Sequence, residues 1–397
     1  MLDDFFKYQA QTTPHPLAMQ VSRASGSYIY NENDEAFLDF VAGVSACSLG
    51  HCHPAIVKAV TEQAASYMHV MVYGEYIQRP AVEFTKLLAS LLPAPLETTY
   101  LTNSGTEATE AAIKLARRVT GRTEMVAARY AYHGNTQGAM SVMGFEERKS
   151  AFRPLIPGTR FIRFNCEEDL LKITRKTAGV ILETIQGGAG FITPENDFLG
   201  KVKQRCTETG ALLILDEIQP GFGRTGTLFG FQNYNVVPDV VITGKGMGGG
   251  MPVGAFITSK AHMATLKEFP KLGHITTFGG HPVIAAACLA TLKELTETNL
   301  IKETLRKERL IRSLLVHPLI KEVRGKGLML CAILENPEVV NHVIFKSLEK
   351  KLILFWLLFE PNALRITPPL TISDEEIKKG CQIILQCLNS YKKAHVN

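Results

Sequence analysis

The chain has 397 residues, of which 46% are hydrophobic and 20% charged, and its formal net charge is +5. This is the composition of a globular protein that is long enough for two lobes. The basic residues are scattered, so we expect no nucleic-acid or membrane partner. The longest apolar run, residues 352–359, is too short to cross a bilayer and predicts one buried strand.

The eight cysteines include no C-x-x-C pair, and the acidic N-terminus lacks the apolar core of a secretory signal. We therefore expect reduced thiols and a cytoplasmic location. The segment His51-Cys52-His53 has the wrong spacing for structural zinc and predicts a tight turn before a helix, so no metal site is expected.

In chain order, residues 1–40 suggest an irregular arm and a hairpin, followed by helices over 54–68 and 79–92. From residue 98 onward strands and helices alternate. We expect a first strand just after residue 98, further strands near 124–128, 161–164, 179–183, 211–216, 239–243 and 253–258, and helices over 106–119, 197–209 and 282–298. This alternation predicts an α/β fold with a mostly parallel central sheet and helices on both faces.

Beyond residue 298 the chain is helical and charged, with short strands expected near 322–330 and 352–359. These segments predict a smaller α+β domain. We assign residues 1–45 and 299–397 to this small domain, built from both termini, and residues 46–298 to the large domain.

Two stretches concentrate the candidate chemistry: ALLILDEIQPGFGRTG at residues 211–226 and VVITGKGMGGGMPVGA at residues 240–255. The first apolar run ends at Asp216, and the second ends near a lone lysine among glycines, Lys245. Parallel sheets place catalytic groups at such strand ends, and a desolvated lysine there is a candidate nucleophile. The plainer alternatives are a buried ion-pair acid and a solvated loop lysine. The sequence around Lys245 does not match a phosphate-binding P-loop.

Two further motifs fit a phosphorylated, planar ligand. Ser104, Gly105 and Thr106 lie between a strand and a helix, where backbone N–H groups can bind phosphate, although a simple helix cap is about as good an explanation. Tyr132, followed by His133, is placed to stack on a planar cofactor, and a core tyrosine is the alternative.

Together, in this order, these motifs resemble the pyridoxal-phosphate enzymes of the aspartate aminotransferase fold (fold type I), and within them the class III aminotransferases. The resemblance covers nearly the whole chain and is strongest in NSGTEA, AYHG, LDEIQPGFGRTG, TGKGMGGGMPVGA, TTFGGHP and LRITPPL. Within class III the chain is most similar to the ornithine, acetylornithine and 4-aminobutyrate aminotransferase group.

The resemblance implies a role for each matching residue. Lys245 would form a Schiff base with pyridoxal 5′-phosphate and shuttle protons, and Asp216 would keep the pyridine nitrogen protonated. Glu183 would brace the acid and the substrate side. The implied cofactor-binding residues are Ser104, Gly105, Thr106, Tyr132, His133, Asp216, Ile218, Gln219, Lys245 and, from a partner subunit, Thr277.

The resemblance also implies an amino acid and a 2-oxo acid as substrates, and a homodimer with shared active sites. Arg365 would bind a substrate carboxylate, and Tyr73 would line the substrate channel of the neighbouring subunit. The chain departs from the ornithine and acetylornithine pattern at two positions, because Gly188 stands where those enzymes usually have glutamate and Asn135 where they often have arginine. Without that glutamate, Arg365 is expected to stay open to substrate.

The leading interpretation is transamination from an ornithine-, acetylornithine- or ω-amino acid-like donor to a 2-oxo acid such as 2-oxoglutarate. Aminomutases, phospho-lyases and racemases of this fold need the same residues, so they remain an alternative. A non-catalytic binding protein is a second alternative, which Lys245 and Asp216 speak against. A nucleotide-binding α/β protein is a further alternative at the level of the fold. No G-x-G-x-x-G motif follows the first strand to support it.

Overall fold

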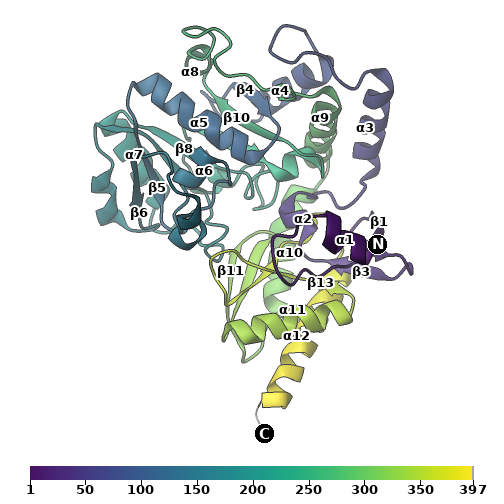
Figure 1. Cartoon of the computed structure of the whole chain (residues 1–397). Helices are drawn as coiled ribbons and strands as arrows, with labels where there is room; N and C mark the ends of the chain where they lie inside the picture. The colour runs from purple at the N-terminus through teal and green to yellow at the C-terminus, as the bar shows by residue number, and fades with distance from the viewer. Residues whose placement is uncertain (396–397) are drawn as a thin grey trace.

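A seven-stranded sheet forms the centre of the larger part of the molecule in the computed structural model, which describes residues 1–395 (Figure 1). In spatial order the strands are β4 (Thr98–Thr102), β10 (Gly254–Thr258), β9 (Val240–Gly244), β8 (Leu212–Asp216), β7 (Thr177–Glu183), β5 (Glu124–Ala128) and β6 (Thr159–Ile162). β10 is antiparallel to both neighbours, and the other neighbouring pairs are parallel. The prediction of a mostly parallel α/β sheet is confirmed.

Alternate residues of the central strands pack into two separate hydrophobic cores, one on each face of the sheet. In β8, Leu213 and Leu215 belong to the larger core, whereas Leu212 and Ile214 belong to the smaller one. Because both faces are covered, β8 is buried along its whole length. This explains why the strand is a continuous apolar run in the sequence.

Helix α5 (Gly105–Thr120) covers the smaller core with a face of alanine, isoleucine and leucine side chains. Ser104 caps its N-terminus by accepting a hydrogen bond from the backbone N–H of Glu107, and Gly121 ends it in the left-handed conformation at φ 66°. The other helices are α1 (Leu2–Tyr8), α2 (Ala42–Ser45), α3 (Pro54–Ser66), α4 (Arg79–Ser90), α6 (Gln137–Ser141), α7 (Phe198–Thr209), α8 (Lys260–Ala264), α9 (Pro282–Glu297), α10 (Leu300–Leu314), α11 (Pro337–Glu349) and α12 (Asp374–His395).

Two four-stranded sheets make up the smaller part of the molecule, at the bottom of Figure 1. One contains β1 (Val21–Ser25), β2 (Tyr28–Asn31), β3 (Ala36–Asp39) and β13 (Leu352–Ile353); the other contains β11 (Ile320–Lys326), β12 (Met329–Leu334), β15 (Ala363–Ile366) and β14 (Phe355–Trp356). The first sheet joins strands from both ends of the chain, since β13 pairs with β3. This pairing supports the proposed small domain of residues 1–45 and 299–397, with residues 46–298 as the large domain.

Three expectations for secondary structure were wrong in detail. The apolar run 352–359 is not one strand, because β13 pairs with β3 in one sheet and β14 pairs with β15 in the other. The strand expected at 322–330 is a hairpin of β11 and β12, which turns at Gly327 with φ 64°. The N-terminal arm contains the short helix α1. Apolar content predicts burial, and it does not show which sheet a residue joins.

The segment around His51-Cys52-His53 forms the predicted turn before α3, which begins at Pro54. His51 Nε2 lies 2.8 Å from Asp39 Oδ2, and this hydrogen bond, with a smaller contribution from Cys47, raises the pKa of His51 to about 10. Within residues 1–395, no group of histidine, cysteine and acidic side chains has the arrangement of a metal site. Over the same residues, no helix has the length and apolar character needed to cross a membrane.

Candidate active site

A cavity of about 710 Å³ opens at the carboxyl ends of the central strands, where ligands of open α/β sheets bind. β7 ends at Glu183, β8 at Asp216, and Lys245 directly follows β9. The structure brings together most of the residues predicted for the site. The cavity is lined by Ser104, Gly105, Thr106, Tyr132, His133, Asn135, Glu183, Gly188, Asp216, Ile218, Gln219, Lys245 and Arg365.

Asp216 is held in a fixed orientation at the floor of this cavity. Its Oδ2 lies 2.7 Å from Nδ1 of His133, and its Oδ1 accepts the backbone N–H of Ile218 at 3.0 Å. His133 is in turn fixed at its backbone, since its carbonyl accepts the Thr109 hydroxyl at 2.9 Å. The opposite ring nitrogen, His133 Nε2, is buried without a partner. The contact that His133 makes in this cavity is therefore the one that holds the carboxylate of Asp216 in place.

Lys245 occupies a strained backbone position in the turn after β9, with φ 41°. Burial lowers the pKa of its ammonium group below the ordinary 10.5, and the nearby Asp216 carboxylate partly opposes this shift. A lowered pKa increases the fraction of free amine, which is the nucleophilic form of lysine.

Glu183 and Glu217 are buried carboxyl groups on either side of Asp216 in the chain. Burial raises the pKa of each to about 7. Glu183 accepts the backbone N–H groups of Tyr132 at 3.2 Å and Gly187 at 2.9 Å. Glu183 thus ties the aromatic wall of the cavity to the segment that contains Gly188. Glu217, which does not line the cavity, accepts hydrogen bonds from Thr184, Gly230 and Phe231.

The N-terminus of α5 points into the cavity, with Ser104, Gly105 and Thr106 in its wall. The first N–H groups of a helix have no acceptor within the helix, so they are available to an anion. A Cβ atom at Gly105 would lie 2.7 Å from Ile218 Cδ1, so Gly105 lets the Ile218 side chain lie close to the start of α5. The hydroxyl of Thr106 lies 2.8 Å from the hydroxyl of Thr136. This terminus is thus capped by Ser104, and its first N–H groups face the cavity wall where an anion could bind.

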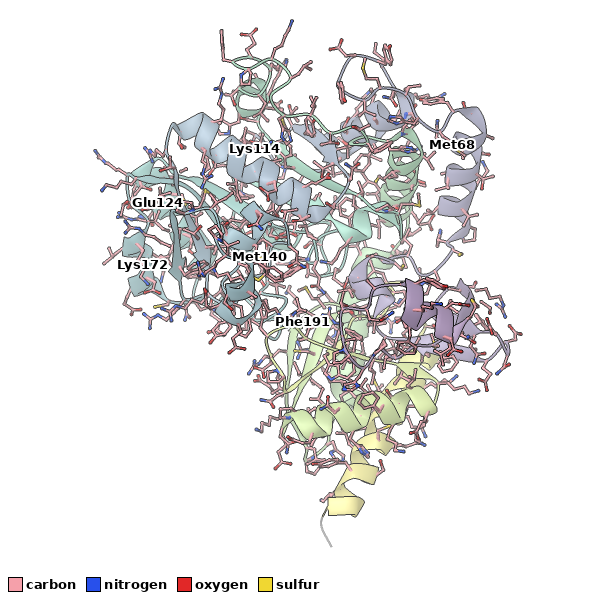
Figure 2. All side chains as sticks on the ribbon, in the orientation of Figure 1. Met68, Lys114, Glu124, Met140, Lys172 and Phe191 are labelled. Atoms are coloured by element: carbon pink, nitrogen blue, oxygen red, sulfur yellow. The ribbon has the colours of Figure 1, made fainter. Side chains whose placement is uncertain are left out.

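Arg365, on β15, carries a buried positive charge into the cavity from the small part of the molecule. Its Nε donates to the Trp356 carbonyl at 3.3 Å, and its Nη1 is buried without a partner. Burial lowers the pKa of this guanidinium to about 10. The ring of Phe191, labelled in Figure 2 where the upper and lower parts meet, has its centroid 5.9 Å from the guanidinium carbon.

Gln219 and Asn135 have different surroundings within the cavity. Gln219 Nε2 donates to Ser45 Oγ at 3.3 Å, which connects the cavity wall to α2. Asn135 is exposed at the cavity mouth. Its amide can contact a substrate there without supplying a charge.

Two predicted residues, Thr277 and Tyr73, do not line the cavity of their own chain. Thr277 is exposed in the loop between α8 and α9, and Tyr73 is partly exposed in the loop between α3 and α4. Both residues are expected to serve the site of a neighbouring subunit, so a place outside the cavity of their own chain is compatible with that expectation.

Sequence analysis missed the apolar part of the cavity wall. The structure adds Met251, Pro252, Val253, Phe355, Trp356 and Leu358, together with Ala46. Trp356 is the one tryptophan of the chain. It lies in an apolar run, so the sequence pattern predicted a buried strand there and did not indicate that Trp356 lines the cavity. Exposure of Phe355 (40%) and Leu358 (36%) distinguishes them from their buried neighbours, and only the folded chain reveals this difference.

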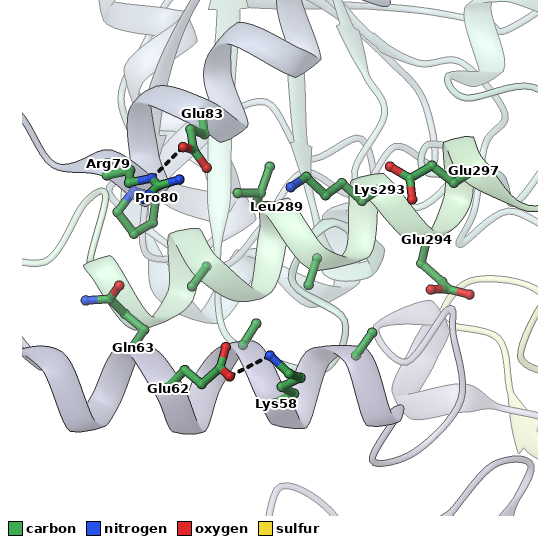
Figure 3. Close-up of a pocket in the computed structure, with 14 residues that line it drawn as sticks. Lys58, Glu62, Gln63, Arg79, Pro80, Glu83, Leu289, Lys293, Glu294 and Glu297 are labelled. Carbon is green, nitrogen blue, oxygen red and sulfur yellow. Dashed lines mark hydrogen bonds and ion pairs between the residues drawn. The ribbon is translucent and has the colours of Figure 1, made fainter.

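A second cavity, of about 540 Å³, lies between α3, α4 and α9 (Figure 3). Small side chains, Ala55, Ala59, Ala286 and Ala290, separate its charged rims. The ion pairs Lys58–Glu62 and Arg79–Glu83 run along α3 and α4. This groove contains none of the predicted site residues.

Known proteins of one family are similar to this chain over nearly its whole length. The sequence profile of the family described as "Aminotransferase class-III" matches residues 8–388. The chain is 36% identical to the acetylornithine aminotransferase of Clostridium acetobutylicum, covering 91% of this chain and 94% of the relative. It is 37% identical to the acetylornithine aminotransferase of Methanosarcina acetivorans, covering 96% and 94%.

Solved structures have the same fold. The ornithine aminotransferase from Toxoplasma gondii superposes with a TM-score of 0.91 at 27% identity, covering 100% of this chain and 96% of that one. A second structure of that enzyme, described as having partial occupancy of PLP at its active site, gives a TM-score of 0.92. The chain belongs to the class III aminotransferases, a family of pyridoxal-phosphate-dependent enzymes. This membership favours an aminotransferase over the non-catalytic alternative.

The residues of the first cavity fit pyridoxal 5′-phosphate. A helix N-terminus is available for the phosphate, and Gly105 keeps the start of α5 close to Ile218, whose side chain would have to shift for a larger residue. Asp216 is buried, its two oxygens are held by His133 and Ile218, and it lines the same cavity as Lys245. The unpartnered nitrogen of Arg365 fits a carboxylate of a substrate bound beside the cofactor.

Proposed function

We propose that this enzyme moves an amino group from an amino acid to a 2-oxo acid such as 2-oxoglutarate, with Lys245 as the residue that carries the cofactor. The observation that supports this most strongly is the placement of Asp216 at the end of β8 and of Lys245 directly after the neighbouring β9, in one cavity with the unpartnered Arg365. Ornithine, acetylornithine and ω-amino acids are the proposed donor class, in line with the acetylornithine aminotransferases among the relatives.

When bound, pyridoxal phosphate withdraws electrons from the substrate carbon that loses a proton. In this role Asp216 would hold a proton at the ring nitrogen through its buried carboxylate, and His133 keeps that carboxylate in place. Lys245 Nζ accepts and returns the substrate proton as a general base and acid. Tyr132 and Ile218 would hold the cofactor ring between them, and Gln219 would supply a hydrogen-bond donor to it.

The segment at the N-terminus of α5 would bind the phosphate through Ser104, Gly105 and Thr106. Arg365 binds one carboxylate of the amino acid and, in the second half of the reaction, of the 2-oxo acid. Glu183 positions Tyr132 and the segment at Gly188 through its two backbone hydrogen bonds. Asn135 contacts the distal part of the substrate.

We infer that the enzyme is a homodimer in which Thr277 completes the phosphate site of the partner subunit and Tyr73 lines its substrate channel. Exposed apolar side chains on the two loops that contain these residues support a partner: Met68 (66%), Ile77 (94%) and Phe278 (52%). The two loops touch, since the rings of His69 and Phe278 are 4.9 Å apart. Sedimentation should give twice the mass of one chain, and a monomer would contradict the inference.

A cytoplasmic location is our proposal for the compartment. The eight cysteines, all within the described residues, are free, and five of them are buried. Thiols that remain reduced are typical of the cytoplasm. Localisation of a tagged chain by microscopy would test this.

The test of the function is the visible spectrum of the cofactor-loaded enzyme, titrated separately with ornithine, acetylornithine, 4-aminobutyrate, glutamate and alanine. Loss of the cofactor band with one of these donors, and its return on adding 2-oxoglutarate, is the expected result. A band that persists with every donor would favour the lyase or mutase alternative. Lys245→Ala should abolish the response, whereas the exposed Lys260→Ala should retain it.

A further inference from the structure

The short element α2, Ala42–Ser45, is a left-handed turn beside the cavity. All four of its residues have φ between 50° and 67°. Glycine tolerates this backbone, whereas a Cβ atom makes it unfavourable, most of all in a β-branched residue such as Val44. Strain of this kind persists only where surrounding contacts fix it, and it is found mainly at functional sites. The left-handed turn therefore needs contacts that hold its shape.

An ion pair between Asp39 and His51 supplies such contacts. Oδ1 of Asp39, the last residue of β3, accepts the backbone N–H groups of Val41 at 2.7 Å and Ala42 at 3.1 Å. Its Oδ2 lies 2.8 Å from Nε2 of His51, whose pKa is raised to about 10, so that this ring is protonated at neutral pH. His51 is itself fixed, because its backbone N–H and carbonyl pair with Gly26 at 2.8 and 2.9 Å. The ion pair therefore holds both ends of the loop that contains the turn.

The left-handed turn contacts the candidate active site in three places. Val44 lines the cavity. The hydroxyl of Ser45 accepts a hydrogen bond from Nε2 of Gln219, which also lines the cavity. A Cβ atom at Gly246 would lie only 3.4 Å from the carbonyl oxygen of Ser45. Since Gly246 directly follows Lys245, the turn lies against the segment that begins with the proposed catalytic lysine.

Loss of the ion pair would release the turn without releasing the rest of the fold. Three of the four residues of the turn carry a Cβ atom and would favour a right-handed or extended backbone. The chain just before the turn would stay attached, because the N–H and hydroxyl of Thr367 donate to the carbonyls of Phe40 and Val41 at 2.7 and 3.1 Å. A relaxed turn would then move Val44 and Ser45 away from their places at the cavity.

We propose that Asp39 and His51 are positioning residues for the reaction, because their ion pair holds the left-handed turn in the shape that the cavity requires. The inference rests on the proposed function and adds to it two residues that do not line the cavity. The pair acts through the turn, which places Val44 in the cavity wall and supports Gln219. The segment His51-Cys52-His53 thus has a role that is not metal binding.

Hydrogen exchange of the purified full-length enzyme, followed by peptide mass spectrometry, gives the first readout. His51→Ala should speed exchange in the peptide that covers residues 41–48 at least about 10-fold, because N–H groups that now donate within the turn would open to water. The matched control is His53→Ala, a half-buried histidine whose Nε2 lies 3.9 Å from Glu294, and it should leave this peptide unchanged. Equal exchange in the wild type and His51→Ala would overturn the proposal.

A glycine in the turn gives the second readout, which separates positioning from a general effect on stability. His51→Ala alone should lower kcat about 10-fold, because the groups at the cavity are misplaced. Ala42→Gly removes a Cβ atom that opposes the left-handed backbone, so it should raise kcat at least about 5-fold more in the His51→Ala background than in the wild type. Ala211→Gly, at a buried alanine outside the left-handed region, is the control and should give no such gain. Equal effects of Ala42→Gly in both backgrounds would overturn the proposal.

Asp39→Asn keeps the shape of the side chain and removes its charge, so it serves for both readouts if His51→Ala does not fold. Failure of the proposed function would look different from failure of the positioning role. The wild type would then show no spectral response to any donor, while exchange in the peptide of residues 41–48 would still respond to His51→Ala. A normal spectral response with unchanged exchange would reject the positioning role alone.

Discussion

Nδ1 of His133 lies 2.7 Å from Oδ2 of Asp216, and both side chains are almost completely buried. The second oxygen of Asp216 is held by the N–H of Ile218, so the carboxylate has little freedom to rotate. The orientation of Asp216 toward the cavity thus depends on a histidine from another strand-to-helix connection.

His133→Ala should therefore lower kcat on the order of 10²-fold, because misplaced catalytic groups cost about this much. KM should change less, since His133 does not reach the substrate side at Arg365. Steady-state kinetics would measure both constants, with the exposed His15→Ala as control. An unchanged kcat would show that Asp216 needs no support from His133.

The buried carboxyl of Glu183 predicts a specific pH dependence of stability. Burial raises its pKa from the ordinary 4.5 to about 7, so between these values the folded state binds more protons than the unfolded state. Stability then falls as pH rises through this window and is highest on its acid side. The destabilisation at pH 8 relative to pH 4.5 is up to roughly 3 kcal/mol for this group.

Urea unfolding of the wild type and Glu183→Gln at pH 5 and pH 8 would isolate this contribution. The variant lacks the titrating group, so its free energy of unfolding should depend less on pH than that of the wild type. Glu217 has a similar pKa and remains in both proteins, so it cancels in the comparison. Parallel pH profiles would contradict the prediction.

The unpartnered guanidinium of Arg365 predicts a selective loss of substrate affinity. Arg365→Lys keeps the charge but loses the planar fork that binds a carboxylate through two hydrogen bonds. KM for the 2-oxo acid should rise roughly 10–100-fold, with a smaller effect on kcat. Arg175→Lys, on the surface, is the control. Equal kinetics in both variants would mean that Arg365 does not bind substrate.

The sequence predicted the polar residues that line the cavity well and the apolar part of its wall poorly, and the reason is physical. Asp216 and Lys245 follow buried parallel strands, whose continuous apolar character is visible locally. The contact of Gly188 with Phe359 joins segments far apart in the chain. The spacing of apolar residues along the chain does not indicate such a contact. The same is true of residues 352–359, which divide between two sheets.

Arg224 is another residue that the sequence did not identify, and it is fully buried. Its Nη1 donates to the carbonyls of Leu328, at 3.1 Å, and Pro368, and its Nη2 donates to Ser48 Oγ at 3.3 Å. Burial lowers the pKa of this guanidinium to about 9. Arg224 thus joins the chain after α2, the β11–β12 turn and the chain just after β15, which carries Arg365.

Arg224→Met should lower the free energy of unfolding by about 2–4 kcal/mol. Methionine fills similar space and removes the cost of burying a charge, yet it leaves two buried carbonyls without donors, at about 1–3 kcal/mol each. Because β15 would lose one attachment, KM for carboxylate substrates should rise as well. Urea unfolding and steady-state kinetics would measure these effects against Arg175→Met. If stability fell while KM stayed unchanged, Arg224 would have only a structural role, and β15 would position Arg365 without its help.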